Sequence, residues 1–320
     1  MALYPRGKGG PCRRTGYGAA ALVLSLGVTC AWTLWGVSEL FHEGWYGPWV
    51  PRLLYLLPAA LWIAWSCLGL AWPRTGGWML VAIGVASALA WNLLSLARGR
   101  WTAIGALATF PVSGIGIPVG VLLLLHAKGQ PQRKMRAGRP AFALAVGVPL
   151  LLGMALAVEP LVRIAGRVDD GDRGMRLISG NGVLLLWAAQ GPGWETTTRG
   201  PTWFEARFAC EHLDAEGRAL SEHPLAIWRL PTAEEAVRSL VRHGAHAGCT
   251  WAGRAGRASC RVRPDKETPL WDPTAPVVYY WTATEADASS AFYVTYSGGV
   301  YAAEKHSGLG SRGYRCVREP

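Results

Sequence analysis

The chain has 320 residues, of which 51% are apolar and only 17% are charged, and it contains 17 tryptophans. Soluble chains average about 25% charged residues, so this composition favours a membrane protein. The formal net charge of +11 is uneven, because residues 1–162 hold thirteen Lys and Arg against three Asp and Glu, and residues 163–320 hold nineteen against eighteen. A basic excess that lies between apolar runs is typical of membrane topology and speaks against nucleic acid as a partner.

Five apolar runs follow one another in the first half of the chain. Each is about 20 residues or longer, which is enough for a helix to cross a hydrocarbon core of about 30 Å. Pro111, Pro118 and several glycines interrupt the fourth run, which predicts a kinked helix there. The sequence therefore predicts a membrane α-helical bundle of five transmembrane helices in residues 1–162. The runs are residues 17–38, 52–72, 76–97, 102–126 and 141–162.

The positions of lysine and arginine predict the orientation of this bundle. With five spans, the N-terminal tail, Arg74 and the loop 127–140 share one side and carry ten basic residues. The other side has three, namely Arg52, Arg98 and Arg100. Because cytoplasmic loops carry the excess of such residues, we expect a multi-pass protein of the cytoplasmic (inner) membrane with a cytoplasmic N-terminus. The residues after about 163 are then extracytoplasmic, or periplasmic, and membrane lipid is an expected partner.

Residues 163–180 are polar and rich in glycine, which predicts a linker before a second domain at residues 181–320. The segment "GVLLLWAA" then predicts a buried strand. Two helices are expected after Thr202 and Thr232, because each threonine has a glutamate three residues later and so forms a capping box.

Further strands are expected in "VVYYWTAT", "AFYVTY" and "VYAAEK", with a closing strand in "RGYRCVR". The "SGG" at 297–299 predicts a hairpin between the last two of the three. The second half is therefore expected to be an α+β domain.

Four cysteines lie in this second half. An even number outside the cytoplasm predicts two disulfides. Cys249 and Cys260 bracket a short loop and form the local pair, which leaves Cys210 in the first helix to pair with Cys316 in the last strand. Zinc ligation is the rival interpretation, and it is disfavoured because no CxxC pair occurs and the compartment is oxidising.

Four segments of the second half resemble the Lcl C-terminal-type domain, and their order and spacing agree with it. That family is similar to the formylglycine-generating enzymes and, more distantly, to C-type-lectin-like folds. The resemblance covers residues 181–320 and implies a compact extracytoplasmic α+β domain with two helices and a twisted antiparallel sheet. It also implies a disulfide between the first helix and the last strand. The segments are "TWFEARFACEHL", "WRLPTAEEAVRSL", "YYWTATEADASSAFYVTYSGGV" and "GYRCVR".

The resemblance does not extend to catalysis. The formylglycine-generating enzymes use a copper-binding cysteine pair shortly before the terminal strand, and the matching segment "VYAAEKHSGLGSRGY" has no cysteine. The sequence also lacks the triplets of calcium-dependent lectins and the common hydrolase, metalloprotease and P-loop motifs. We therefore expect no catalytic residue, no metal site and no cofactor, and a divergent enzyme of this group is the disfavoured alternative.

The sequence favours a non-catalytic protein that displays a ligand- or protein-recognition domain. Four arginines in a glycine-rich loop and one tryptophan are the candidate contact residues, suited to an anionic glycan or an acidic protein face. The segment 263–273 is either an exposed recognition loop or a packed structural loop. An accessory or structural subunit of a larger membrane complex is the alternative function. The candidate residues are Arg254, Arg257, Arg261, Arg263 and Trp271.

Overall fold

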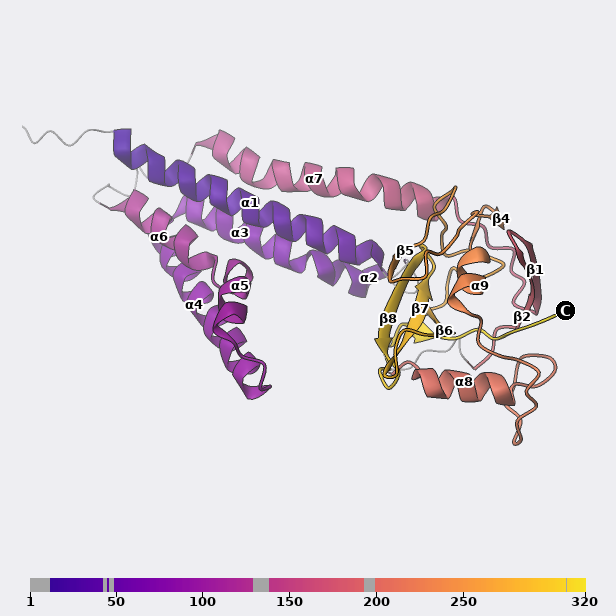
Figure 1. Ribbon diagram of the computed structural model, residues 1–320. Helices are drawn as coiled ribbons and strands as arrows, with labels where there is room; N and C mark the ends of the chain where they lie inside the picture. Colours follow the sequence, from indigo (N-terminus) through magenta and orange to yellow (C-terminus); the bar gives the residue numbers. More distant parts are fainter. Residues whose placement is uncertain (1–11, 43–44, 46–48, 129–137, 193–198, 309) are drawn as a thin grey trace, which may run out of the picture. The chain divides into compact units, whose positions relative to one another are not determined.

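A computed structural model describes residues 12–42, 45, 49–128, 138–192, 199–308 and 310–320 (Figure 1). The chain forms two compact units. One consists of Met1–Leu40 with Leu53–Val158, and the other of Phe41–Arg52 with Glu159–Pro320. The first half is helical and the second half is rich in strands, as the sequence predicts. Much of the basic N-terminal tail and of the loop 127–140 lies outside the described residues.

Long helices make up the first half of the chain. Four helical segments are long and apolar enough to cross a membrane, namely Gly16–His42, Trp49–Ala71, Pro73–Ala97 and Arg139–Ala165. The helices are α1 (Cys12–His42), α2 (Trp49–Arg52), a 3-10 turn (Leu53–Leu56), α3 (Leu57–Ala71), α4 (Pro73–Ala97), α5 (Ala103–Ser113), α6 (Gly116–Ala127) and α7 (Arg139–Ala165).

The fourth apolar run is broken rather than continuous. Helices α5 and α6 meet at an angle of 53°, and only the two together are long and apolar enough to cross a membrane. Thr102 begins α5 by accepting a hydrogen bond from the Gly105 amide at 2.9 Å. The kink that the two prolines predict is therefore present, and the described helices provide four spans, or five if the broken pair crosses as one.

Glycines allow α4 and α6 to approach closely. A Cβ atom on Gly120 would lie 2.5 Å from the Gly77 carbonyl oxygen, and one on Gly84 would lie 2.8 Å from the Ile117 amide nitrogen. Gly116 and Gly120 are four residues apart, the spacing by which membrane helices bring their backbones together. Lipid provides little hydrophobic force between helices, so this contact stabilises the bundle mainly through van der Waals packing.

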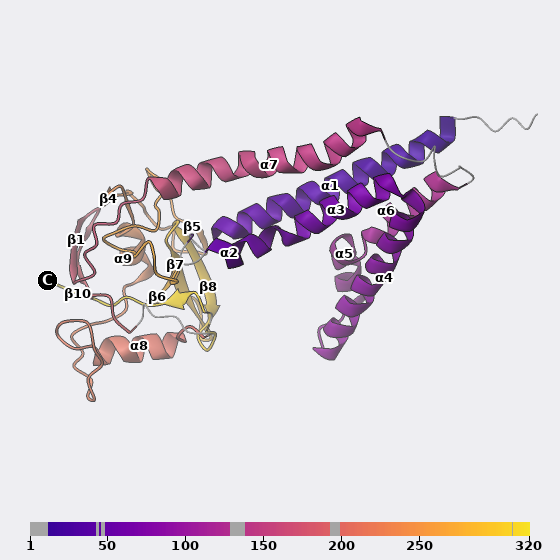
Figure 2. The same ribbon diagram turned by 180° about the vertical axis from the view of Figure 1, so that it is seen from behind.

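The described residues of the second unit form three small sheets, whose strands are labelled in Figure 2 where there is room. One has the order β1-β2-β10, the next is the β3–β4 hairpin, and the largest has the order β5-β8-β7-β6-β9. The "SGG" turn joins β7 to β8 as an antiparallel hairpin, as the sequence predicts. The strands are β1 (Arg176–Gly180), β2 (Val183–Trp187), β3 (Val241–Arg242), β4 (Ala245–His246), β5 (Gly256–Arg257), β6 (Tyr279–Glu285), β7 (Ser290–Thr295), β8 (Gly299–Glu304), β9 (Arg312–Gly313) and β10 (Val317–Arg318).

Helices α8 and α9 pack with these sheets, and both begin at the predicted capping boxes. Thr202 caps α8 (Trp203–His212) and Thr232 caps α9 (Ala233–Arg238). In both ribbon views, α9 lies between the five-stranded sheet and the β1–β2 hairpin (Figures 1 and 2). Its apolar face joins a core that includes residues of both sheets, so one helix holds the two sheets together.

Both predicted disulfides are present. Cys210 of α8 is bonded to Cys316 beside β10, 106 residues later, and Cys249 is bonded to Cys260. Cys210 is fully buried.

The segment predicted as a linker, residues 163–180, has regular structure. Helix α7 runs on to Ala165, and strand β1 occupies Arg176–Gly180. Local polarity and glycine content suggested a solvated linker, but ion pairs with the distant Asp265 and Asp272 and the pairing of β1 with the neighbouring β2 order this segment.

Replacing Gly120 with leucine should destabilise the helical unit by about 1–3 kcal/mol, because the larger side chain must push α6 away from the backbone of α4. Thermal unfolding of the full-length protein in mild detergent measures the effect. Gly147→Leu in α7 is the control, since a Cβ there meets nothing within 4 Å. Equal midpoints for the two variants would contradict the close contact.

Candidate functional site

The loop closed by the Cys249–Cys260 disulfide carries two of the four candidate arginines, and a third follows it directly. Arg254, Arg257 and Arg261 are exposed, and none of them pairs with a carboxylate among the described residues. Strand β5 pairs with β8 through Gly256 and Val300, which fixes the middle of the loop. The loop therefore presents positive charge from an ordered backbone.

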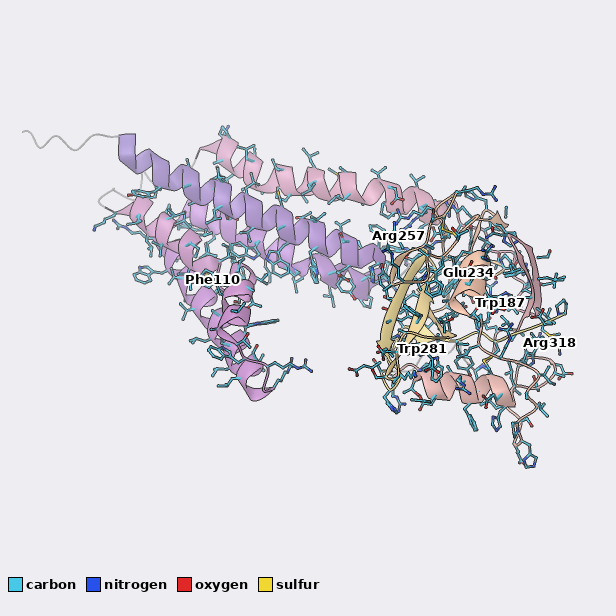
Figure 3. All side chains as sticks on the ribbon, in the orientation of Figure 1. Phe110, Trp187, Glu234, Arg257, Trp281 and Arg318 are labelled. Carbon is cyan, nitrogen blue, oxygen red and sulfur yellow. A yellow bond between two sulfur atoms is a disulfide. The ribbon has the colours of Figure 1, made fainter. Side chains whose placement is uncertain are left out.

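A tryptophan holds the tip of this loop in place. The Trp251 indole N–H donates to the Arg254 carbonyl oxygen at 2.8 Å, and its ring meets Phe292 of β7 edge-on. Figure 3 shows Arg257 on one side of the domain and Arg318 on another, so the arginines of the unit do not form a single patch.

Arg263 belongs to a different environment from the other three. Its guanidinium lies 3.0 Å from the Glu159 carboxylate at the end of α7. Partial burial, followed by the nearby positive charge of Arg163, lowers the pKa of Arg263. The structure thus separates the four arginines into an exposed loop and one residue at the foot of α7.

Trp271 does not join the arginines at the surface. It is 1% exposed, and its ring stacks on Tyr280 with the centroids 3.8 Å apart. Leu270 beside it is equally buried. Of the two interpretations of segment 263–273, the structure therefore shows the packed structural loop, and Trp271 contributes to the core instead of offering a face to a ligand.

Three consecutive charged residues in this segment are fully buried. Asp265, Lys266 and Glu267 have no exposed surface. The Asp265 carboxylate accepts from Arg167 at 2.9 Å and from Arg242 at 3.2 Å. Burying charges costs several kcal/mol each unless they are paired and hydrogen-bonded, so these guanidinium contacts are what makes the burial of Asp265 tolerable.

The Glu267 carboxylate accepts hydrogen bonds from backbone amides of two separate chain segments. One oxygen accepts from the Val168 amide at 2.9 Å, and the other accepts from the His243 amide. His243 has a φ of 53°, so the hairpin between β3 and β4 turns in the left-handed region to present that amide. Residues just after α7 are thereby joined to the β3–β4 hairpin through one carboxylate.

Lys266 is the unusual member of the triplet. Its ammonium group donates to the Ala275 carbonyl oxygen. Burial, and then the positive charge of Arg167, lower its pKa to about 7. The pKa of Lys266 therefore lies close to neutral pH. Its neighbours Asp265 and Glu267, in contrast, accept hydrogen bonds from arginine side chains and backbone amides.

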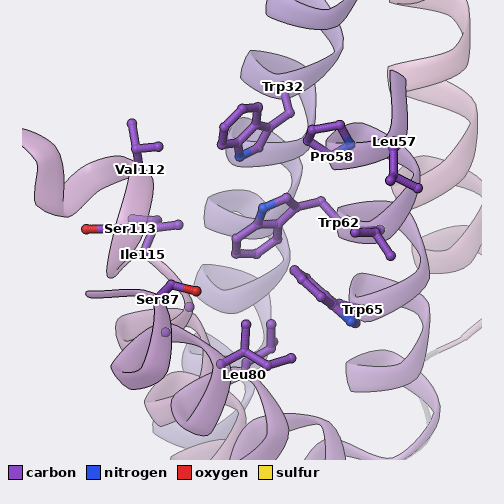
Figure 4. Close-up of a pocket in the computed structure, with 14 residues that line it drawn as sticks. Trp32, Leu57, Pro58, Trp62, Trp65, Leu80, Ser87, Val112, Ser113 and Ile115 are labelled. Carbon is purple, nitrogen blue, oxygen red and sulfur yellow. The ribbon is translucent and has the colours of Figure 1, made fainter. Parts of the chain in front are cut away.

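The helical unit has its own cavity of about 230 Å³. Figure 4 shows Trp32 of α1 and Trp62 of α3 beside it, facing the break between α5 and α6 at Ser113 and Ile115. The Ser113 hydroxyl already donates to the Thr109 carbonyl oxygen. The described residues that line the cavity include no ionisable side chain.

The described residues contain no group of three or more His, Cys, Asp or Glu that is placed to hold a metal ion. His246 lies 2.6 Å from the Ser179 carbonyl oxygen, and His42 lies 3.0 Å from the Tyr279 hydroxyl. These histidines are individual hydrogen-bonding partners and are not arranged together as an acid–base pair.

Sequence reasoning missed the buried charge cluster. The signal was present, since Arg163 and Arg167 are one turn apart at the end of α7, and "RPDKETP" alternates charge between two prolines. Such a pattern is usually solvated, and only the tertiary contacts show that these charges meet.

Comparison of the chain with protein-family models, curated proteins and solved structures gives no match.

Replacing Asp265 with asparagine should destabilise the second unit by about 3–5 kcal/mol, because it leaves Arg167 and Arg242 buried with one neutral partner. Chemical denaturation of the full-length protein, followed by fluorescence of the buried tryptophans, measures the change. Glu216→Gln removes one negative charge at an exposed position and should have little effect. A loss no larger than that of the control would show that the cluster contributes no net stability.

Proposed function

We propose that the chain is a five-span protein of the cytoplasmic membrane whose C-terminal Lcl-type domain, related in fold to the formylglycine-generating enzymes, binds an anionic ligand outside the cytoplasm. The observation that carries this proposal is the set of exposed arginines Arg254 and Arg257 on a disulfide-closed loop and Arg261 directly after it, without carboxylate partners among the described residues. Arginine forks suit carboxylate, sulfate and phosphate groups, which they bind through paired hydrogen bonds.

The fixed backbone of the loop supports binding rather than simple solvation. A flexible loop loses conformational entropy when it binds, and a preorganised loop loses less. The Cys249–Cys260 disulfide, the β5–β8 pairing and the Trp251 hydrogen bond each restrain the same short segment. An anionic glycan or an acidic protein face meets this surface without reshaping it.

The expected absence of catalysis remains part of the proposal. The segment in which related enzymes hold a cysteine pair corresponds here to β8 and the residues after it, where Lys305 pairs with Glu285 at 2.6 Å. That ion pair engages Lys305 beside the sheet, and the segment contains no cysteine. We therefore assign recognition, and not cysteine oxidation, to the domain.

A second candidate function, an accessory subunit of a larger membrane complex, is favoured by one further surface. Phe204 and Phe208 lie one turn apart on α8 and are 44% and 56% exposed. They border a surface depression of about 790 Å³ that also includes Leu220 and Tyr314. Exposed apolar surface of this kind is typical of a protein–protein contact.

Reversing the charge of Arg254 and Arg257 to glutamate should weaken binding of an anionic polymer at least about tenfold, or 1.4 kcal/mol. Binding of the full-length protein in detergent to heparin, as a sulfated glycan, and to polyglutamate, as an acidic polypeptide, measures the loss. Heparin and polyglutamate also distinguish the two classes of ligand.

The matched control reverses Arg207 and Arg218, which are exposed and change the net charge by the same amount. A fall in affinity in both double variants would indicate a general charge effect. Unchanged binding by the Arg254/Arg257 variant would remove the loop from the proposal.

A further inference from the structure

Three chain segments that border apolar spans come together in the second unit. They are the end of α1 at His42, the short helix α2 ending at Arg52, and the end of α7 from Glu159 onward. The Tyr296 hydroxyl donates to the His42 carbonyl oxygen at 3.1 Å, which joins the end of α1 to the five-stranded sheet. Residues at the ends of spans lie at the level of the lipid headgroups, where arginine side chains meet phosphates.

Positive charge exceeds negative charge at this place. Asp265 and Glu267 are already engaged by donors, and Glu159 is shared between Arg263 at 3.0 Å and Arg163 at 3.9 Å. Six cationic residues therefore face four carboxylates, one of which is also held by Arg173. The cations are Arg52, Arg163, Arg167, Arg242, Arg263 and Lys266, and the carboxylates are Glu159, Asp265, Glu267 and the Arg173-bound Asp272.

The buried guanidinium of Arg163 has room for a further hydrogen-bond acceptor. The residue is 9% exposed, and its Nε lies 3.5 Å from Asp265. Its Nη1 atom is buried and has no hydrogen-bond partner among the described residues. A buried guanidinium N–H without an acceptor is costly, so this atom marks a position that an additional acceptor would stabilise.

The cluster is open on one side. The side chains of Arg263 and Glu159 are 46% and 60% exposed, so an anion can reach Arg263 from solvent or from the headgroup layer. Arg257 is close enough to add its positive charge to that of Arg163 in lowering the pKa of Arg263. An anion placed between Arg163 and Arg263 would relieve this repulsion.

We propose that Arg163 and Arg263, at the foot of α7, bind the phosphate group of an anionic membrane phospholipid. The bilayer supplies this phosphate at high local concentration at the depth where α7 ends, and two guanidinium forks match its oxygens. The Glu159 carboxylate is the internal competitor, because it occupies Arg263 when lipid is absent. The site is separate from the Arg254 loop and does not depend on a ligand binding there.

Native mass spectrometry of the full-length protein, delipidated in mild detergent and titrated with phosphatidylglycerol or phosphatidylcholine, tests this proposal. We expect one phosphatidylglycerol to bind at least about tenfold more tightly than phosphatidylcholine. Arg263→Gln should weaken phosphatidylglycerol binding about tenfold, and Arg163→Gln should weaken it at least as much. Arg218→Gln, at an exposed position away from the site, should leave it unchanged.

The variant Glu159→Gln gives the sharpest outcome, because it should strengthen phosphatidylglycerol binding severalfold by releasing Arg263. A purely structural role for these residues would not give opposite effects for the two partners of one ion pair. Arg163→Gln can also disturb folding through Asp265, so the half-exposed Arg263 and Glu159 decide the result.

Equal affinity for the two lipids, or unchanged binding in both Arg263→Gln and Glu159→Gln, would overturn the proposal. Heparin that displaces bound phosphatidylglycerol from the wild type but not from the Arg254/Arg257 double variant would also overturn it, because the lipid would then occupy the loop.

Discussion

The structure of the second unit depends on the burial of Asp265 and Glu267 among arginines and backbone amides. Asp265 gathers Arg167 from the residues after α7 and Arg242 from β3, while Glu267 accepts from the amides of Val168 and His243. Removing either carboxylate takes an acceptor away from buried donors, so both carboxylates help to hold the segment after α7 against the β3–β4 hairpin. The end of a membrane helix thus continues directly into a folded domain.

The charged residues near the end of α7 and the loop with Arg254 belong to the same compact unit. The loop with Arg254 is restrained by its own disulfide, and its neighbour Arg263 reaches the end of α7 through Glu159. The arginine loop and the end of α7 from Glu159 onward are therefore parts of one compact unit. A domain on a free linker would lack this connection.

The sequence predicted the local elements well and the tertiary contacts poorly. Capping boxes at Thr202 and Thr232, the "SGG" hairpin and both disulfides follow from short patterns whose physical causes lie within a few residues, or from the number of cysteines. The buried triplet 265–267 and the burial of Trp271 depend on residues about a hundred positions apart and on Tyr280, so composition alone left open whether this segment is exposed or packed. The glycine contact between α4 and α6 likewise emerges only when two helices are placed side by side.

Hydrogen–deuterium exchange at the amides of Val168 and His243 in the full-length protein tests the central claim most directly. If Glu267 holds both amides in a buried cluster, they should exchange as slowly as core amides of β7 such as that of Val294, which open only with the whole domain. Exchange of Val168 at the rate of the exposed loop at Gly171 would show that residues after α7 behave as a free linker, and would contradict the account.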